Sequence, residues 1–220
     1  MAFALKPGIH CCLRDNTPIF LDLTANRYFQ LGSEAGQAFL GLVQGVSLHE
    51  EQIADLDRLE AIGLLIKVPG AAKSGAALVT HHALPTREVA GMSGMTTLAL
   101  LPLVLPMLLV MRLRLRLFPK FVLQQAGKRR SHRAGARLLV SVASLVAAFD
   151  LAGLILSRAD RCLERSLVMR DLLELSGHRA DLVLGVATRP FGAHCWVQQG
   201  DLLIGDSIER VSFFQPIAVL

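Results

Sequence analysis

The feature that most constrains the fold is the segment 69–95, which contains four glycines and two prolines among several alanines and serines. Such a composition favours a linker over a helix or a strand. It separates a first segment with short strands and two helices from a second segment that begins with long apolar helices. The sequence therefore predicts a domain over 1–68, a linker over 69–95 and a second domain over 96–220, both of the α+β class.

The first domain is predicted to combine short strands with two helices. The strands are expected at Ile9–Leu13, Pro18–Leu23, Arg27–Leu31 and Leu64–Val68. Arg14-Asp15-Asn16-Thr17, between the first two strands, is a turn-rich spacer typical of a hairpin. Ser33 is expected to cap the first helix, and the second helix, over Glu51–Ile62, is expected to end at Gly63. These elements describe a small winged-helix-like unit.

The second domain is predicted to be helical at first and then to form a sheet. Helices are expected over Leu98–Leu117, Pro119–Ala126, Ser131–Leu156 and Arg161–Leu175. Asp160 is expected to cap the last of these helices, and Ser176-Gly177 to end it. A buried strand over Leu182–Val186 and a hairpin of Ala193–Gln198 with Leu202–Asp206 are expected to follow.

The charge pattern bears on the partners of the chain, whose net charge is +5. Between Val89 and Phe149 there are nine basic residues and no acidic one, a pattern that either attracts an anionic partner or solvates a helix face. The basic cluster Lys128-Arg129-Arg130 has no interleaved aromatic residues, so we do not expect nucleic-acid binding. An acidic partner or an anionic lipid surface fits better.

One uncharged apolar stretch, Thr96–Met111, calls for a comparison with membrane spans. Its length of about 16 residues is below the ~20 that a bilayer requires. Pro102 and Pro106 each remove a backbone donor, so a continuous spanning helix is not expected. The sequence instead predicts a buried helix or a peripheral membrane contact through 96–118.

The four cysteines, Cys11, Cys12, Cys162 and Cys195, form no CxxC pair, and the N-terminus does not resemble a signal sequence. We therefore expect free thiols in a cytoplasmic protein, with membrane association as the alternative. Adjacent strand residues point to opposite faces, so His10, Cys11 and Cys12 are not expected to converge on a metal ion. No metal and no cofactor are predicted.

Cys162 is the candidate nucleophile. It is expected at the second or third position of its helix, where the unpaired N–H groups stabilise a thiolate. The thiolate is the reactive form of cysteine, so this location favours covalent catalysis. The alternative is a structural cysteine packed in the core.

The predicted hairpin offers a base for this nucleophile. If Gln199–Asp201 form a three-residue loop, His194 lies opposite Asp206 and shares a face with it. A carboxylate beside an imidazole fixes its tautomer and stabilises its charged form. A two-residue loop would shift the pairing by one residue and break this geometry. Alternatively, His194 is a half-buried strand residue and Asp206 a turn residue.

Several motifs in this region resemble the transglutaminase-like peptidases of lasso-peptide biosynthesis in their fused form, the B proteins. The motifs are Cys162-Leu163, Ser176-Gly177-His178, Asp181–Val186, Pro190–Val197 and Ile204-Gly205-Asp206. The resemblance covers roughly 158–210 and implies a papain-like or transglutaminase-like fold with Cys162, His194 and Asp206 as catalytic residues. Cys195 departs from the family, whose members usually have a small residue such as Ala between the His and the Trp.

The first domain is similar to the peptide-recognition domain related to the pyrroloquinoline-quinone accessory protein. The matching residues are the strand pair, Asn26–Leu31, Ser33 and Leu59–Leu65. The resemblance implies a groove between the third strand and the last helix that binds a leader peptide, and an exposed strand edge suits this role. The binding residues would be Arg27, Tyr28, Phe29, Gln30, Leu31, Leu56, Leu59 and Leu64, although each apolar member could equally belong to the core.

Together these observations predict a cysteine peptidase that binds the leader of a ribosomally made precursor and cleaves it from the core peptide. The resemblance implies that a separate ATP-dependent, asparagine-synthetase-like cyclase then closes the macrolactam. The Cys162 N–H is the expected oxyanion donor, whereas Ser157 and Arg158 are weak candidates. Two alternatives stay open: a transamidase that uses the same acyl-enzyme, and a non-catalytic carrier of the leader peptide.

Overall fold

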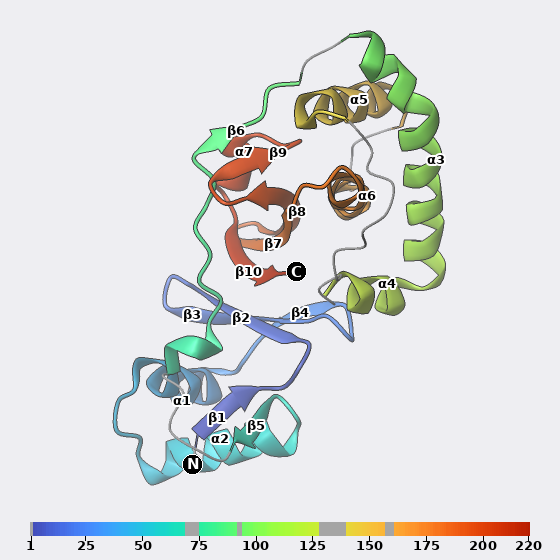
Figure 1. The fold of residues 1–220 in the computed structure, drawn as a ribbon. Coiled ribbons are helices and arrows are strands. Elements are labelled where there is room, and N and C mark those ends of the chain that lie inside the picture. Colours follow the sequence, from blue (N-terminus) through green and yellow to red (C-terminus); the bar gives the residue numbers. More distant parts are fainter. Residues whose placement is uncertain (1, 69–74, 92–93, 128–139, 157–160) are drawn as a thin grey trace. The chain divides into compact units, whose positions relative to one another are not determined.

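The computed structural model describes residues 2–68, 75–91, 94–127, 140–156 and 161–220 and has a mixed α+β fold (Figure 1). Its contacts divide the chain into two compact units. The N-terminal unit comprises Met1–His82 with Gln215–Ala218, and the C-terminal unit comprises Ala83–Phe214 with Val219–Leu220. The predicted helix start at Ser131, the Asp160 cap and the Lys128-Arg129-Arg130 cluster lie outside the described residues.

The N-terminal unit contains two small antiparallel sheets. One has the order β2-β3-β4, and the other pairs β1 with β5. The strands are β1 (Ala2–Leu5), β2 (Ile9–Arg14), β3 (Thr17–Asp22), β4 (Arg27–Gln30) and β5 (Leu65–Val68). The predicted hairpin is confirmed, and Asp15 and Asn16 form its turn with positive φ, as a two-residue loop requires. The sequence analysis missed β1, which is too short to show an alternating pattern.

Two helices follow β4, namely α1 (Ser33–Gln44) and α2 (Glu50–Ala61). The prediction that Ser33 caps the first helix was wrong: Gly32 is the capping residue and no side chain binds the free N–H groups. Glycine is tolerated there because its backbone leaves those groups accessible to water. Gly63, which has a φ of +75°, follows the second helix as predicted.

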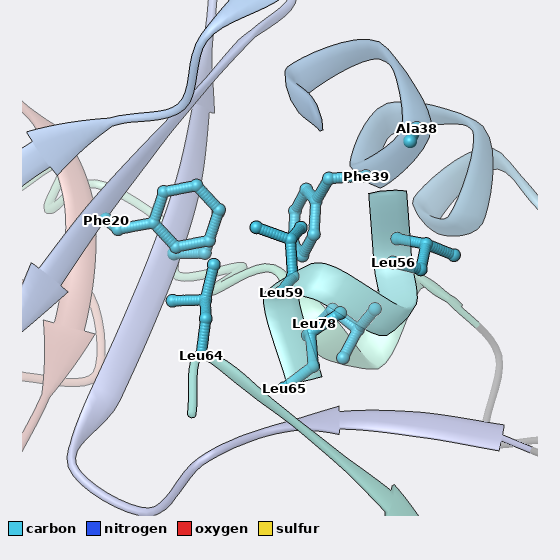
Figure 2. Close-up of a cluster of buried hydrophobic side chains, with 9 residues drawn as sticks. Phe20, Ala38, Phe39, Leu56, Leu59, Leu64, Leu65 and Leu78 are labelled. Atoms are coloured by element: carbon cyan, nitrogen blue, oxygen red, sulfur yellow. The ribbon is translucent and has the colours of Figure 1, made fainter. Parts of the chain in front are cut away.

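The core of the N-terminal unit brings the sheet and both helices together (Figure 2). The ring of Phe20 on β3 lies 5.0 Å from that of Phe39 on α1, edge to face. Leu56, Leu59 and Leu64 are at most 4% exposed in the same cluster. These three leucines, predicted to line a peptide pocket, are therefore buried in the core cluster that also contains Phe20 and Phe39.

The segment predicted as a linker contains two short elements, the 3-10 helix η1 (Gly75–Leu78) and strand β6 (Arg87–Glu88). Within the N-terminal unit, the Thr80 N–H donates to the Cys11 carbonyl at 2.7 Å. Within the C-terminal unit, β6 pairs in parallel with β9, and Arg87 binds both oxygens of Asp201 at 2.8 Å. Composition alone does not reveal these bonds, because the partners are distant in sequence.

Strands β7, β8, β9 and β6 of the C-terminal unit belong to a five-stranded sheet of order β10-β7-β8-β9-β6. Its remaining strands are β7 (Asp181–Thr188), β8 (Phe191–Gln199), β9 (Leu202–Ile204) and β10 (Gln215–Val219), and a short helix, α7 (Ile208–Val211), follows β9. β7, β8 and β9 are consecutive and antiparallel. Because β8 and β9 are antiparallel, the N-terminal half of β8, which contains His194, lies on the same side of the sheet's length as the C-terminal end of β9, which precedes Asp206.

Between β6 and β7 the described residues form four helices: α3 (Met95–Leu117), α4 (Pro119–Ala126), α5 (Val142–Ile155) and α6 (Cys162–Leu175). α3 confirms the helix predicted over Leu98–Leu117, begins three residues earlier and continues through both Pro102 and Pro106. Its packing against α5 and α6 compensates for the two missing backbone donors. By length and composition alone, α3 is the one helix in the described part of the chain that could cross a membrane.

The core of the N-terminal unit generates a stability prediction. Leu59→Ala removes a buried side chain and leaves a cavity, so we expect the free energy of unfolding to fall by about 2–5 kcal/mol. Ile62→Ala is the matched control: Ile62 is 74% exposed, so its loss is expected to change stability by less than about 0.5 kcal/mol. Urea denaturation followed by circular dichroism measures both. Equal losses for the two variants would contradict this description of the core.

Candidate active site

Cys162 is the first residue of α6, one or two positions earlier than predicted. Arg161 precedes it as the capping residue and makes no side-chain cap. The N–H groups of a first helical turn have no partner within the helix, and their partial positive charge stabilises an anion. The thiol of Cys162 therefore lies in the part of the helix that most favours a thiolate.

The hairpin that carries His194 does not have the predicted register. Gln199 pairs with Leu202 and Val197 with Ile204, so the loop has two residues, Gly200 and Asp201, and the pairing is shifted by one. In this register Asp206 is not the cross-strand neighbour of His194. The predicted three-residue loop was therefore wrong.

His194 and Asp206 nevertheless contact each other. His194 Nε2 lies 2.6 Å from Asp206 Oδ2, and the two side chains are 10% and 14% exposed. The contact is possible because β9 ends at Ile204 and Gly205 adopts a φ of +75°. This left-handed residue turns the chain after the strand and brings the carboxylate back toward β8.

Asp206 is held by the start of α7, which the sequence analysis missed. Its Oδ1 accepts the Ser207 N–H at 2.9 Å and lies 3.9 Å from Arg210 Nη1. Ser207 caps α7 by accepting the Arg210 N–H at 3.4 Å. An Asp-Ser pair before a polar helical turn is a capping signal that could have predicted this helix.

The imidazole of His194 is also fixed by its apolar neighbours. Its ring centroid lies 5.1 Å from that of Phe214 and 6.2 Å from that of Trp196. Gly185 pairs with His194 on the next strand, and a Cβ there would come within 3.0 Å of both Trp196 and Phe214. The absence of a side chain at Gly185 thus lets the two rings pack beside His194.

The pKa values define an ion pair between Cys162 and His194. Hydrogen bonds from Cys195 and His194 lower the pKa of Cys162 to about 4, although burial opposes this shift. Burial alone would lower the pKa of His194, but hydrogen bonds with Asp206 and Cys162 raise it to about 9. Because Nε2 is engaged by Asp206, Nδ1 is the ring nitrogen left for the thiol. A thiolate and an imidazolium therefore face each other at neutral pH.

Cys195 supplies a hydrogen bond that the sequence analysis did not assign. Burial and the neighbouring Cys162 raise the pKa of Cys195, so Cys195 keeps its proton. Its S–H then donates a hydrogen bond to the Cys162 thiolate. Its side chain is 3% exposed, and its carbonyl accepts the Ser166 hydroxyl of α6 at 3.1 Å. The second thiol thus acts on the first through a hydrogen bond.

These side chains line a cavity of about 790 Å³ within the C-terminal unit. Cys162, His194 and Asp206 contribute to its wall, and Arg161, Arg165 and Arg210 give it a basic character. No group of three or more His, Cys, Asp or Glu residues in the described ranges is arranged to hold a metal ion. A thiolate paired with an imidazolium in such a cavity can attack a carbonyl carbon and protonate a leaving amine.

The predicted leader-binding residues belong to the N-terminal unit. Arg27–Gln30 form β4, an edge strand of the three-stranded sheet of the N-terminal unit, and Leu31 lies beyond its end. Phe29 stacks on Phe20 with ring centroids 5.3 Å apart, so its side chain packs toward the core. What β4 offers to a peptide is mainly its backbone edge.

The model of the transglutaminase-like superfamily matches residues 105–219, more than half of the chain. The protein therefore belongs to the transglutaminase-like superfamily. The matched segment contains Cys162, His194 and Asp206. A search of the curated proteins and a search of the solved structures each found no match.

The ion pair generates a prediction about thiol reactivity. Because the pKa of Cys162 is lowered, its thiolate persists above pH ~4, and alkylation by iodoacetamide is expected to slow as the pH falls through that value. Cys195→Ala removes a hydrogen bond to the thiolate, so the midpoint should move to higher pH. Cys195→Ser keeps a donor and should restore most of the shift. Mass spectrometry of the alkylated protein measures each rate, and an unmoved midpoint in Cys195→Ala would refute the assigned role.

Gly205 generates a second prediction, with Gly200 as its control. A Cβ at Gly205 would lie 2.9 Å from Met169 Cε on a backbone of positive φ, so Gly205→Ala should displace Asp206 and lower the pKa of His194. Gly200 also has a positive φ but nothing within 4 Å of a Cβ. Gly200→Ala should therefore cost similar backbone strain, about 1 kcal/mol, and leave the histidine unchanged. NMR titration of His194 distinguishes the two, and identical titrations would contradict the role of Gly205.

Proposed function

We propose that this protein is a cysteine peptidase that removes the leader from a ribosomally made lasso-peptide precursor. The observation that carries the proposal is the hydrogen-bonded series of a thiol at a helix start, an imidazole and a carboxylate, Cys162–His194–Asp206. The superfamily match is consistent with cysteine-peptidase or transamidase-type activity. Cys162 would be the nucleophile, His194 the acid and base, and Asp206 the group that orients the imidazole.

The proposed reaction proceeds through an acyl-enzyme. The Cys162 sulfur bonds to the scissile carbonyl carbon, and the Cys162 N–H at the start of α6 stabilises the oxyanion. When the C–N bond breaks, the proton on His194 passes to the leaving amine of the core peptide. Water then attacks the thioester, returns a proton to His194 and releases the leader as a carboxylic acid. Ser157 and Arg158, the other oxyanion candidates, lie outside the described residues.

The N-terminal unit would act as a winged-helix-like module that binds the leader. Its support is the edge position of β4, which leaves backbone groups able to pair with an extended peptide. A leader held by one unit raises the effective concentration of the scissile bond near the other. By the resemblance, the amine released is the substrate of a separate ATP-dependent, asparagine-synthetase-like cyclase. The four free cysteines fit a cytoplasmic location for this sequence of reactions.

Transamidation is the second candidate, since the superfamily match is equally consistent with it. The same acyl-enzyme would then be attacked by an amine in place of water. The products of the two reactions differ in mass. Hydrolysis gives two products whose summed mass is that of the substrate plus one water, whereas transfer gives a product in which the acyl group is joined to the amine. Mass spectrometry of the products therefore separates them.

The decisive experiment compares the wild type with Cys162→Ala, each incubated with a lasso-peptide precursor. We expect cleavage to fall by at least about a thousandfold, because the substitution removes the proposed nucleophile. Binding of a synthetic leader, measured by fluorescence anisotropy, should be unchanged. Cys12→Ala is the matched control, since Cys12 is buried on β2 of the N-terminal unit and is not among the residues that line the cavity, so this variant should cleave normally. Cleavage at the wild-type rate by Cys162→Ala would exclude the peptidase, and binding without any cleavage by the wild type would favour a carrier.

A further inference from the structure

α3 is apolar on two opposite sides. Its inner stripe, Thr97, Leu100, Val104, Leu108 and Met111, is buried. This stripe follows the helical spacing of three and four residues and packs against α5 and α6 of the same unit. In Figure 1, α5 and α6 lie on the same side of α3. The inner stripe therefore accounts for the contribution of α3 to the fold.

The opposite side of α3, which we term the outer face, is exposed. It consists of Met95, Leu98, Pro102, Pro106, Leu109, Val110, Leu113 and Leu117. At 100° per residue these positions fall within a sector of about 120°. Leu98, Leu109, Val110, Leu113 and Leu117 are each between 50% and 60% exposed. The outer face is therefore a continuous apolar strip. Single exposed leucines are common on protein surfaces, but a contiguous strip of them marks an interaction site.

Basic and aromatic residues extend this strip at its C-terminal end. Arg114 and Arg116 flank Leu113 and Leu117, and Lys120 follows at the start of α4; all three are exposed. Phe118 and Phe121 are 61% and 53% exposed beside them. From Val89 to Phe149 the sequence has no acidic residue. This combination of apolar side chains, aromatic rings and uncompensated positive charge is complementary to an anionic lipid surface.

We propose that the outer face of α3 binds the surface of an anionic bilayer, with the helix parallel to the membrane plane. α3 would not cross the bilayer, because its inner stripe is occupied by α5 and by α6, the helix that begins with Cys162. The leucines of the outer face enter the acyl boundary, while Arg114, Arg116 and Lys120 contact the lipid phosphates. This inference concerns a surface separate from the cavity and does not depend on the proposed peptidase reaction.

Flotation of the full-length protein with vesicles tests this proposal. We expect binding to vesicles of equal parts phosphatidylglycerol and phosphatidylcholine, weaker binding to phosphatidylcholine alone, and a loss of the difference at high salt. Leu109→Gln with Leu113→Gln should weaken binding at least tenfold, because two exposed leucines no longer enter the bilayer. Arg114→Gln with Arg116→Gln should reduce mainly the preference for the anionic vesicles.

Ile62→Gln is the matched control, because it changes an exposed isoleucine on the other unit and should float as the wild type does. Unchanged alkylation of Cys162 by iodoacetamide shows that each variant of α3 is folded. Three outcomes overturn the proposal: a wild type that does not float, outer-face variants that float like the wild type, and equal binding to both vesicles at low salt. If the wild type does not float but forms a dimer in analytical ultracentrifugation, and Leu113→Gln abolishes the dimer, the outer face binds a second copy of the chain and not a membrane.

Discussion

The hydrogen bond between His194 and Asp206 is the interaction on which the chemistry of the C-terminal unit depends. Burial disfavours a charged imidazole, and on its own it would lower the pKa of His194. The carboxylate 2.6 Å from Nε2 reverses this effect and also leaves Nδ1 for the thiol. An imidazolium held in this way stabilises the Cys162 thiolate, so the charge on the sulfur is set by a residue that does not touch it. Loss of the Asp206 carboxylate would therefore lower the pKa of His194 and raise that of Cys162.

The elements that carry this site follow from the sequence, but the geometry that joins them does not. A contact between His194 and Asp206 was expected from a three-residue loop, and the loop has two residues. Glycine at position 200 suits either loop, because both require a residue of positive φ. The contact survives through Gly205, whose left-handed turn offsets the shifted register. An alternating pattern specifies which residues share a face only inside a strand, and Asp206 lies beyond the end of β9.

In the N-terminal unit and in α3, too, the elements follow from the sequence but their packing does not. Helical spacing identified Leu56 and Leu59 as one stripe, yet only the packing of α2 against Phe20 and Phe39 distinguishes a core residue from a pocket residue. The sequence predicted a helix over Leu98–Leu117, and tertiary packing along the inner stripe holds α3 together despite the backbone donors missing at Pro102 and Pro106. The exposure of its outer face could not be predicted, since both sides of α3 are apolar in sequence.

Cys195 shows how position, with residue type held constant, assigns chemical roles. Two thiols lie within hydrogen-bonding distance of each other, and either could in principle lose its proton. Cys195 is almost fully buried on β8, so ionisation there would place a charge away from water and away from a helix start. Cys162 is partly exposed at the first position of α6 and faces the imidazole. The proton therefore stays on Cys195, which becomes a hydrogen-bond donor, and the site has a single thiolate.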